Sequence, residues 1–344
     1  MVYNWFHKTD IDQRFYEEHI RERLPQRIVD AHVHMNLEKH VKNVSPERIA
    51  MDWALECGLQ MDYEASRTYY HALFPDREVE LVAFPFPLAE VDIPGNNRYL
   101  AGLAREKGIC GLMSVRPEWS SEYCEETLLG NPFAGFKPYP YLASQIKGAD
   151  ISIYDFIPGE QLAVLDRHKK ALVLHLPRRG RLPAPDNIRE LREIRQAYPD
   201  IRIVLAHYGR CFTTEMFQKG TDALGEDLDG FYFDTAAVIN PQVHRMAMER
   251  LDGSRIIYGT DLPIMAWHGI REWQSDTPSN YCREEFSWNH HEKRDEENGF
   301  TYIAYLQLKN MLDAIGENKN VREKIFYENA KEVFRTEREG GKVR

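Results

Sequence analysis

Eight short apolar runs recur along this chain of 344 residues, and a segment with helical spacing follows each of them. Strands that are apolar almost throughout are typical of a parallel sheet covered on both faces, and the helical segments would provide the crossovers. Eight such units predict an α/β fold of the (β/α)8 type, the TIM barrel. The runs occupy residues 28–34, 79–86, 108–115, 133–139, 171–176, 201–207, 231–236 and 255–261.

Two segments between or after the runs show the helical pattern best. Residues 185–199, "PDNIRELREIRQAYP", have apolar side chains at helical spacing, and Pro185 stands near the start, where a helix tolerates proline. Residues 300–316, "FTYIAYLQLKNMLDAIG", supply the eighth crossover helix. A doubly wound open sheet is the alternative fold, but no Gly-x-Gly-x-x-Gly follows the first run, so its dinucleotide-binding form lacks support.

Three insertions lengthen the segments that follow the first, fourth and eighth runs. They comprise residues 36–78, 138–159 and 268–299. In a barrel these connections all lie at the carboxyl-terminal face, where barrel enzymes carry out their chemistry. We therefore expect inserted βα loops to cap that face and shape a pocket, with solvated loops of no further role as the alternative.

The remaining organisation follows from composition. We expect an N-terminal helical extension (1–26), a single barrel domain (27–335) and a charged tail (336–344). Residues 4–23 would pack either across a subunit boundary or across the bottom of their own barrel, so a homo-oligomer stays open. Five scattered cysteines without a Cys-x-x-Cys predict reduced thiols and a cytoplasmic protein.

Charge and hydropathy exclude several classes of partner. The net charge is −10 and no dense basic stripe interrupts it, which argues against nucleic-acid binding. No apolar run approaches the length that spans a membrane, and the first residues lack the apolar core of a secretory signal. A small molecule is the expected partner.

Two histidines end the first run, in "RIVDAHVHM" (27–35). Side chains alternate along a strand, so His32 and His34 should share a face with Asp30, while residues 29, 31 and 33 face the other way. Two imidazoles one strand pleat apart can bind the same metal ion. Asp30 would either orient a ligand imidazole or be a buried, hydrogen-bonded carboxylate.

Polar side chains also end three later runs: His175 ends the fifth, His207 the sixth and Asp261 the eighth. In a barrel these ends converge on one mouth, and divalent ions accept imidazole nitrogen and carboxylate oxygen. Any one of these residues alone could be a buried histidine or a capping aspartate. Five of them at four strand ends predict a metal site.

With this order of His-x-His, His, His and Asp, the chain resembles the amidohydrolase superfamily, specifically its amidohydrolase-2 branch. The resemblance spans about residues 27–334 and includes the ending "KIFYENAKEVF". It implies that His32, His34 and Asp261 are metal ligands and that His175 is a further ligand. His207 would be either a ligand to a second ion or a group that contacts the substrate.

Lys137, in "AGFKPYP", stands where binuclear members of the superfamily carry a carboxylated lysine that bridges two metals. An ammonium group has no lone pair, whereas the carbamate formed with carbon dioxide would be a bidentate anion. The alternatives are an ammonium that binds a substrate carboxylate or phosphate, and a structural lysine. We favour one ion with Lys137 uncarboxylated, with Zn²⁺ expected and Mn²⁺, Fe²⁺ or Co²⁺ also able to fit.

Substrate-binding candidates come from the same strand ends. Guanidinium groups bind carboxylate or phosphate as a fork, so Arg116 and Arg178 suggest a small anionic substrate. Tyr139 follows Lys137, and His268 lies seven residues after Asp261. Both could line the pocket, although packing would explain the tyrosine equally well.

These residues predict a metal-dependent hydrolase that cleaves a C–O or C–N bond of a lactone, amide or ester. The ion would lower the pKa of a water toward about 7, Asp261 would accept its proton, and His207 would polarise the electrophile. A metal-dependent decarboxylase or other lyase acting on a small carboxylic acid is the alternative, with Asp261 as the proton donor to carbon. A non-catalytic metal-binding protein is the third reading, and five inward polar groups argue against it.

Overall fold

The computed structural model describes residues 2–335 except 43, 51, 87, 144–149, 252 and 275–276, so the predicted tail lies outside the described residues. Eight parallel strands form one sheet in sequence order, and this confirms the predicted barrel. Each strand overlaps one of the predicted runs, and most strands end two or more residues before the run does. The strands are β1 (Arg27–His34), β2 (Glu78–Phe84), β3 (Cys110–Met113), β4 (Phe133–Phe136), β5 (Ala171–Leu174), β6 (Arg202–Leu205), β7 (Tyr232–Asp234) and β8 (Ile256–Ile257).

The barrel closes between β1 and the residues at and after the end of β8. The Ala31 amide donates to the Tyr258 carbonyl at 3.0 Å, the Asp261 amide donates to the His32 carbonyl at 3.0 Å, and the His34 amide donates to the Leu262 carbonyl at 2.8 Å. We call these three bonds the closing seam. Because the seam uses backbone groups of His32, His34 and Asp261, it also sets the positions of their side chains.

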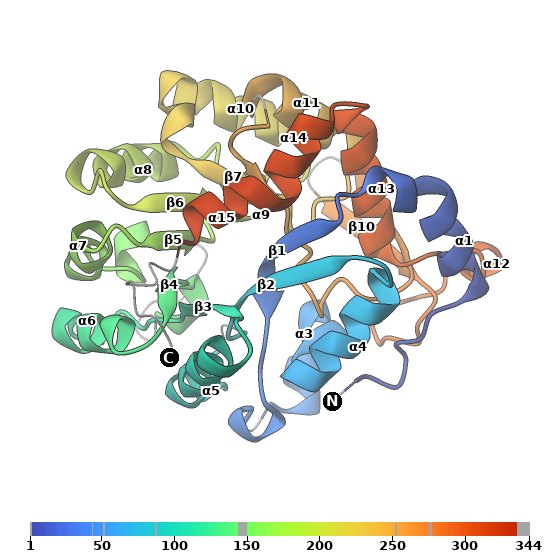
Figure 1. Cartoon of the computed structure of the whole chain (residues 1–344), viewed down its shortest axis with the longest axis horizontal. Helices are drawn as coiled ribbons and strands as arrows, with labels where there is room; N and C mark the ends of the chain where they lie inside the picture. The colour runs from blue at the N-terminus through green and yellow to red at the C-terminus, as the bar shows by residue number, and fades with distance from the viewer. Residues whose placement is uncertain are drawn as a thin grey trace, which may run out of the picture.

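Helices surround the strands (Figure 1). Both helices predicted in detail are present, as α8 and α13. The longer helices are α1 (Asp10–His19), α4 (Tyr63–Leu73), α5 (Ile93–Glu106), α6 (Ser121–Leu129), α7 (Gly159–Arg167), α8 (Pro185–Ala197), α10 (Thr214–Leu224), α11 (Pro241–Leu251) and α13 (Ile303–Ile315). The short ones are α2 (Pro46–Ala50), α3 (Trp53–Gly58), α9 (Ala206–Arg210), α12 (Arg294–Glu297), α14 (Lys319–Glu323) and α15 (Asn329–Val333). None of the helices within the described residues has the length and apolar character needed to cross a membrane.

The three predicted insertions differ in structure. Residues 36–78 contain α2, α3 and α4, whereas the described part of 138–159 contains only short 3-10 turns. The insertion 268–299 forms an antiparallel hairpin of β9 (Gly269–Gln274) and β10 (Thr277–Cys282). All three follow the carboxyl end of a barrel strand, as expected.

Alternation along the strands divides the core into two parts. In β5, Ala171 and Val173 belong to a cluster that fills the barrel, whereas Leu172 and Leu174 belong to the larger cluster between the strands and the helices. All four side chains are fully buried. This explains why the runs are apolar almost throughout: both faces of each strand are covered.

The face predicted for Asp30 is wrong, because the pairing of β1 with β2 shifts register between Asp30 and Val33. Ala31 packs inside the barrel and Val33 packs in the outer cluster. Asp30 accepts a hydrogen bond from the hydroxyl of Tyr70 on α4 at 2.6 Å, so it faces the helices. The irregularity turns His32 to the inner face directly after Ala31, an effect typical of a β-bulge.

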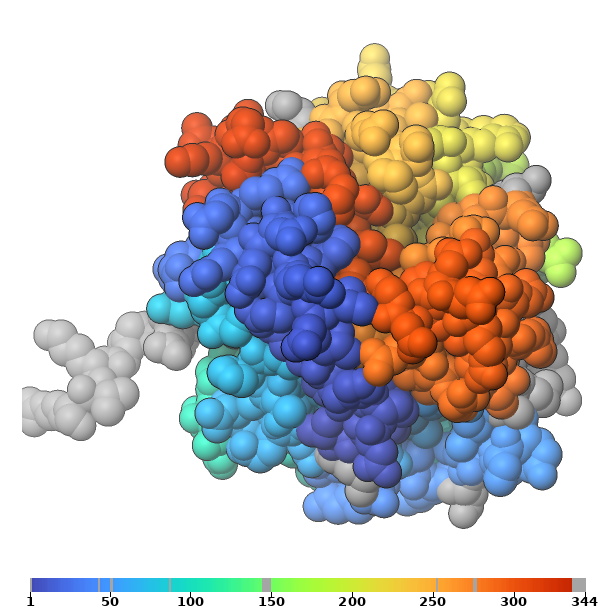
Figure 2. All heavy atoms as spheres, turned by 90° about the vertical axis from the view of Figure 1, so that its right-hand side faces the viewer, coloured from blue at the N-terminus to red at the C-terminus, as the bar shows by residue number. Residues whose placement is uncertain are grey.

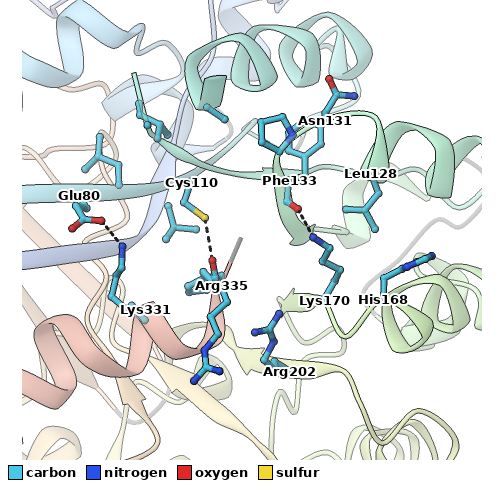
Figure 3. Close-up of a pocket in the computed structure, with 18 of the residues that line it drawn as sticks. Glu80, Cys110, Leu128, Asn131, Phe133, His168, Lys170, Arg202, Lys331 and Arg335 are labelled. Atoms are coloured by element: carbon cyan, nitrogen blue, oxygen red, sulfur yellow. Dashed lines mark hydrogen bonds and ion pairs between the residues drawn. The ribbon is translucent and has the colours of Figure 1, made fainter. Parts of the chain in front are cut away.

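At the amino-terminal end of the barrel, the described residues include no group of histidines and carboxylates able to hold a metal ion. There α15 packs Ala330, Val333 and Phe334 against the cluster that fills the barrel. A cavity of about 1480 Å³ lies beside it, lined by residues at strand starts such as Cys110 and Phe133 (Figure 3).

The N-terminal extension packs along α13 and the insertion 268–299 of its own chain, as Figure 2 shows for the blue and orange segments. A buried imidazole joins these parts: His268 Nε2 lies 2.9 Å from Asp12 Oδ2, and His268 Nδ1 lies 2.6 Å from Glu284 Oε1. Burial acts to lower the pKa of His268, but the hydrogen bonds to the two carboxylates outweigh burial and raise it. Both ring nitrogens of His268 are held by these carboxylates, so its contacts give no support to the prediction that it lines the substrate pocket.

We expect His268→Gln to destabilise the protein by about 3 kcal/mol near pH 6, since it leaves two buried carboxylates without their cation. The pKa of His268 is raised in the folded state, so its contribution is complete below the unfolded value of about 6.5 and is lost as pH rises through the folded value. Urea unfolding of the wild type and the variant from pH 5.5 to 9 measures this difference. His19→Gln, at a half-buried histidine on α1 that lies 3.9 Å from a single exposed glutamate, is the matched control. A difference that stays constant with pH would contradict the account.

Candidate metal centre and active site

His32, His34 and Asp261 form a compact cluster at the carboxyl-terminal mouth of the barrel. Asp261 Oδ1 lies 3.1 Å from His34 Nε2 and 3.5 Å from His32 Nε2. One donor atom from each residue lies within 4.8 Å of the other two, and all three side chains are buried. This is the arrangement that the sequence predicted for the first three ligands.

The charge states of these residues suit a divalent ion. Burial lowers the pKa of His32 and of His34, and it lowers that of His207 to about 4, so these imidazoles are neutral at pH 7 and have a lone pair. Burial acts to raise the pKa of Asp261, but the hydrogen bond from His34 and the neighbouring imidazoles outweigh it and lower the pKa. Neutral imidazole and ionised carboxylate are the forms that bind metal.

His207 lies on a strained turn immediately after β6. The φ angles of His207, Tyr208 and Arg210 are 56°, 50° and 64°, and that of Gly209 between them is 69°. Non-glycine residues in this left-handed region cost roughly 1–2 kcal/mol each, and such strain is concentrated at functional sites. The turn brings the His207 ring to 4.7 Å from the ring of His32.

Asp234, at the end of β7, is a site residue that the sequence reading missed. Its Oδ2 lies 2.9 Å from His32 Nδ1, and its Oδ1 accepts the His207 amide at 2.7 Å. A carboxylate on one imidazole nitrogen fixes the ring so that the other nitrogen is presented to a metal. Asp234, His32 and His207 form a second group able to hold an ion. The signal was available, because Asp234 follows three aromatic residues in the run "FYFDTA" and is its one charged residue.

His175 lies at the edge of the cluster. Its ring centre is 5.4 Å from that of His207 and 4.6 Å from that of Tyr139. Among the described residues it joins neither compact group. Burial lowers its pKa well below the usual value, with Arg210 adding to the effect, so it too is neutral. Its role as a further ligand stays a prediction.

Lys137 is fully buried, and within the described part of the chain its Nζ has no hydrogen-bond partner. The Nζ lies 5.0 Å from the ring centre of Phe84 and 5.3 Å from that of Tyr139. Burial lowers the pKa of Lys137 to about 8, while Asp234 and Asp261 act to raise it. Both the ammonium and the neutral amine are therefore accessible near neutral pH, so the anion-binding and carbamate readings of Lys137 both stay open.

The two arginines that were predicted to bind substrate, Arg116 and Arg178, both lie near glutamate side chains. Arg178 forms two short hydrogen bonds to the carboxylate of Glu190 (2.6 and 2.9 Å) and a third to Asn187. These bonds direct the guanidinium toward α8, so they give no support to the prediction that Arg178 binds substrate. Arg116 lies 3.6 Å from Glu118 and stays a candidate.

Solved structures share this fold, although no family model and no curated protein matches the chain. A probable 2-pyrone-4,6-dicarboxylic acid hydrolase of Acinetobacter baumannii, with citric acid bound, is 13% identical with a TM-score of 0.53, covering 89% of this chain and 98% of that one. Amidohydrolase 2 of Bifidobacterium longum subsp. infantis is 14% identical with a TM-score of 0.55, covering 90% and 99%. A dihydroxybenzoic acid decarboxylase of Polaromonas, with manganese and 2-nitroresorcinol bound, is 14% identical with a TM-score of 0.52, covering 90% and 97%.

At these identities the likeness concerns the fold. The resemblance of the sequence implied a TIM barrel. This chain forms that fold, and it shares the fold with these three structures, one of which is named Amidohydrolase 2. The residues of the site must carry the functional argument on their own chemistry.

We expect Asp234→Asn to weaken binding of a divalent ion by roughly 10- to 100-fold, because His32 loses the carboxylate that orients it. Titration of metal-free protein with Zn²⁺ or Mn²⁺ in a calorimeter measures the affinity. Asp229→Asn, an exposed aspartate shortly before β7, is the matched control. Equal affinities for the two variants would remove Asp234 from the site.

Proposed function

We propose that this chain is a metal-dependent enzyme of the amidohydrolase-2 type. It hydrolyses a C–O or C–N bond of a small anionic lactone, amide or ester. The observation that carries the proposal is the buried cluster of His32, His34 and Asp261 at the carboxyl ends of barrel strands, the end at which barrel enzymes act.

One divalent ion would be held by His32, His34 and Asp261, with His175 as a further ligand. When bound, the ion supplies Lewis acidity and activates water at neutral pH. Zinc is our first choice, and manganese, which the Polaromonas neighbour binds, suits the same donors. His207 and a carboxylated Lys137 would be needed for a second ion.

The chain's own groups move protons and hold the substrate. Asp261 is ionised, so it accepts a proton from water at its carboxylate oxygen and returns it to the leaving group. Asp234 keeps His32 in position through Nδ1. As an ammonium, Lys137 binds an anionic group of the substrate, and His207 polarises the group that is attacked.

Decarboxylation is the second candidate, because several of the neighbours with this fold are named decarboxylases. The same residues would serve: Lys137 would hold the carboxylate before carbon dioxide leaves, and Asp261 would deliver a proton to the carbon left behind. The two reactions differ in the bond that breaks and in the proton that Asp261 carries: it is ionised at the start of hydrolysis, whereas it must first take up a proton from water before it can protonate carbon in decarboxylation.

The rest of the chain fits one catalytic domain of residues 27–335 with the extension 1–26 packed on its side. The five cysteines are all free thiols in the fold, which supports a reducing, cytoplasmic environment.

A substrate panel tests the function. Lactones, amides and esters that carry carboxylates are followed by acid release, and aromatic and dienoic carboxylic acids are followed by release of carbon dioxide. We expect turnover of a lactone, amide or ester that stops when a chelator is added and returns with Zn²⁺ or Mn²⁺. Carbon dioxide release alone would replace hydrolysis with decarboxylation, and turnover indifferent to chelation would contradict both.

We expect Asp261→Asn to lower kcat by roughly 10²- to 10⁴-fold with a small change in KM, because it removes the proton acceptor. The assay is run at saturating metal so that weaker ion binding does not contribute. Asp186→Asn, an exposed aspartate on α8, is the control. A near-normal kcat would remove Asp261 from proton transfer.

A further inference from the structure

His244, on helix α11, is a buried histidine that the proposed mechanism does not use. Its Nδ1 lies 3.2 Å from the hydroxyl of Tyr208, the residue that follows His207 in the chain. Its Nε2 lies 2.9 Å from the carbonyl oxygen of Val238, in the loop after β7. Both His244 and Tyr208 are only 1% exposed. The two ring nitrogens of His244 therefore join the turn after β6 to the loop after β7.

The partners of His244 determine where its hydrogens lie. A carbonyl oxygen can only accept, so Nε2 carries a hydrogen and donates it to Val238. Burial lowers the pKa of His244 to about 4, so the ring is neutral at pH 7 and Nδ1 has a lone pair. The Tyr208 hydroxyl then donates to Nδ1. Both ring nitrogens have a partner within the protein, which is the arrangement expected for a buried histidine that holds other groups in place.

The same two segments hold His207. Ala236, two residues before Val238, accepts a hydrogen bond from His207 Nδ1 at 2.8 Å. That bond places a hydrogen on Nδ1, so the lone pair of the neutral ring is on Nε2, where a substrate or an ion would meet it. His244 thus connects the residue next to His207 with the loop that accepts the ring hydrogen of His207.

The turn needs support because its backbone conformation is unfavourable. His207, Tyr208 and Arg210 all have positive φ angles, and such a conformation persists only where surrounding contacts determine it. The ring of Tyr208 is packed between two helices: its centre lies 5.4 Å from that of Phe217 on α10 and 5.6 Å from that of His244 on α11. The Tyr208 side chain is therefore a route by which these helices can fix the turn.

Two further contacts connect the ends of β6 and β7 with the loops that follow. Asp234 Oδ1 accepts the His207 amide at 2.7 Å, so it fixes where the turn begins. Asn240 Nδ2 donates to the Phe212 carbonyl at 3.3 Å, beyond the turn. Neither contact involves His244. We therefore expect replacement of His244 to loosen the turn while the barrel keeps its fold.

We propose that His244 is a positioning residue, whose hydrogen bonds to Tyr208 and Val238 hold the left-handed turn so that His207 keeps its ring hydrogen on the Ala236 carbonyl. This inference rests on the proposed function, in which His207 polarises the group that is attacked. His244 acts on that step through Tyr208 and the loop after β7, and not by contact with the substrate.

Exchange of imidazole hydrogens with water tests the proposal, measured by NMR on zinc-loaded protein with ¹⁵N-labelled histidines. The Nδ1 hydrogen of His207 is assigned by the loss of its signal in His207→Gln. We expect it to exchange roughly 10-fold faster or more in His244→Leu and in Tyr208→Phe, which removes only the hydroxyl. His244→Gln keeps a donor for the Val238 carbonyl, so its exchange rate should fall between those of the wild type and His244→Leu.

The ring hydrogens of His268 are the internal reference, because Asp12 and Glu284 hold them in another part of the structure. Arg245→Leu, at an exposed position of α11, is the matched control and should exchange as the wild type does. Faster exchange at His207 with His268 unchanged would support the proposal. Equal acceleration at both rings would show that His244 only stabilises the fold, and this result or unchanged exchange at His207 would overturn it.

The exchange measurement requires no turnover. Its failure is therefore separate from a failure of the proposed function, which would be seen as protein that neither holds a metal nor depends on one for turnover.

Discussion

The closing seam between β1 and the residues at and after the end of β8 is the constraint on which the site depends. It joins the amide of Asp261 to the carbonyl of His32, so the first and last residues of the His32, His34 and Asp261 cluster are adjacent through the backbone. Gly259 is required beside the seam, because a Cβ there would lie 2.8 Å from the Cβ of His32. Asp30 holds the same loop from the outer face by accepting the Thr260 amide at 2.9 Å. The close packing of His32, His34 and Asp261 is thus a consequence of how the barrel closes.

Much of this could be predicted from the sequence, because strands buried on both faces must be apolar and barrel strands must end at one mouth. That reasoning was enough to bring His32, His34 and Asp261 together. It could not find the bulge that turns Asp30 outward, since pairing with β2 decides it. It also could not identify remote partners: Asp12 lies 256 residues from His268, and nothing in the pattern around Arg178 identified Glu190 as its partner.

The hairpin of β9 and β10 is another part of the fold whose contacts the sequence could not predict. Periodicity gives no path for a loop, so Arg271 could not be assigned to the mouth until its contacts with Ala237 and Trp53 were known. A buried cluster of neutral imidazoles with one ionised aspartate calls for a cation, which a divalent metal ion would supply.

Metal content per chain is the measurement that tests the central claim most directly. The protein is purified without chelators, with bicarbonate present, and analysed for Zn, Mn, Fe and Co, beside a His32→Ala, His34→Ala double variant. The account predicts about one divalent ion per chain in the wild type and a large loss in the variant. About two ions would instead indicate a carboxylated Lys137 that bridges them. No ion in the wild type, even after Zn²⁺ or Mn²⁺ is added, would contradict the account at its centre.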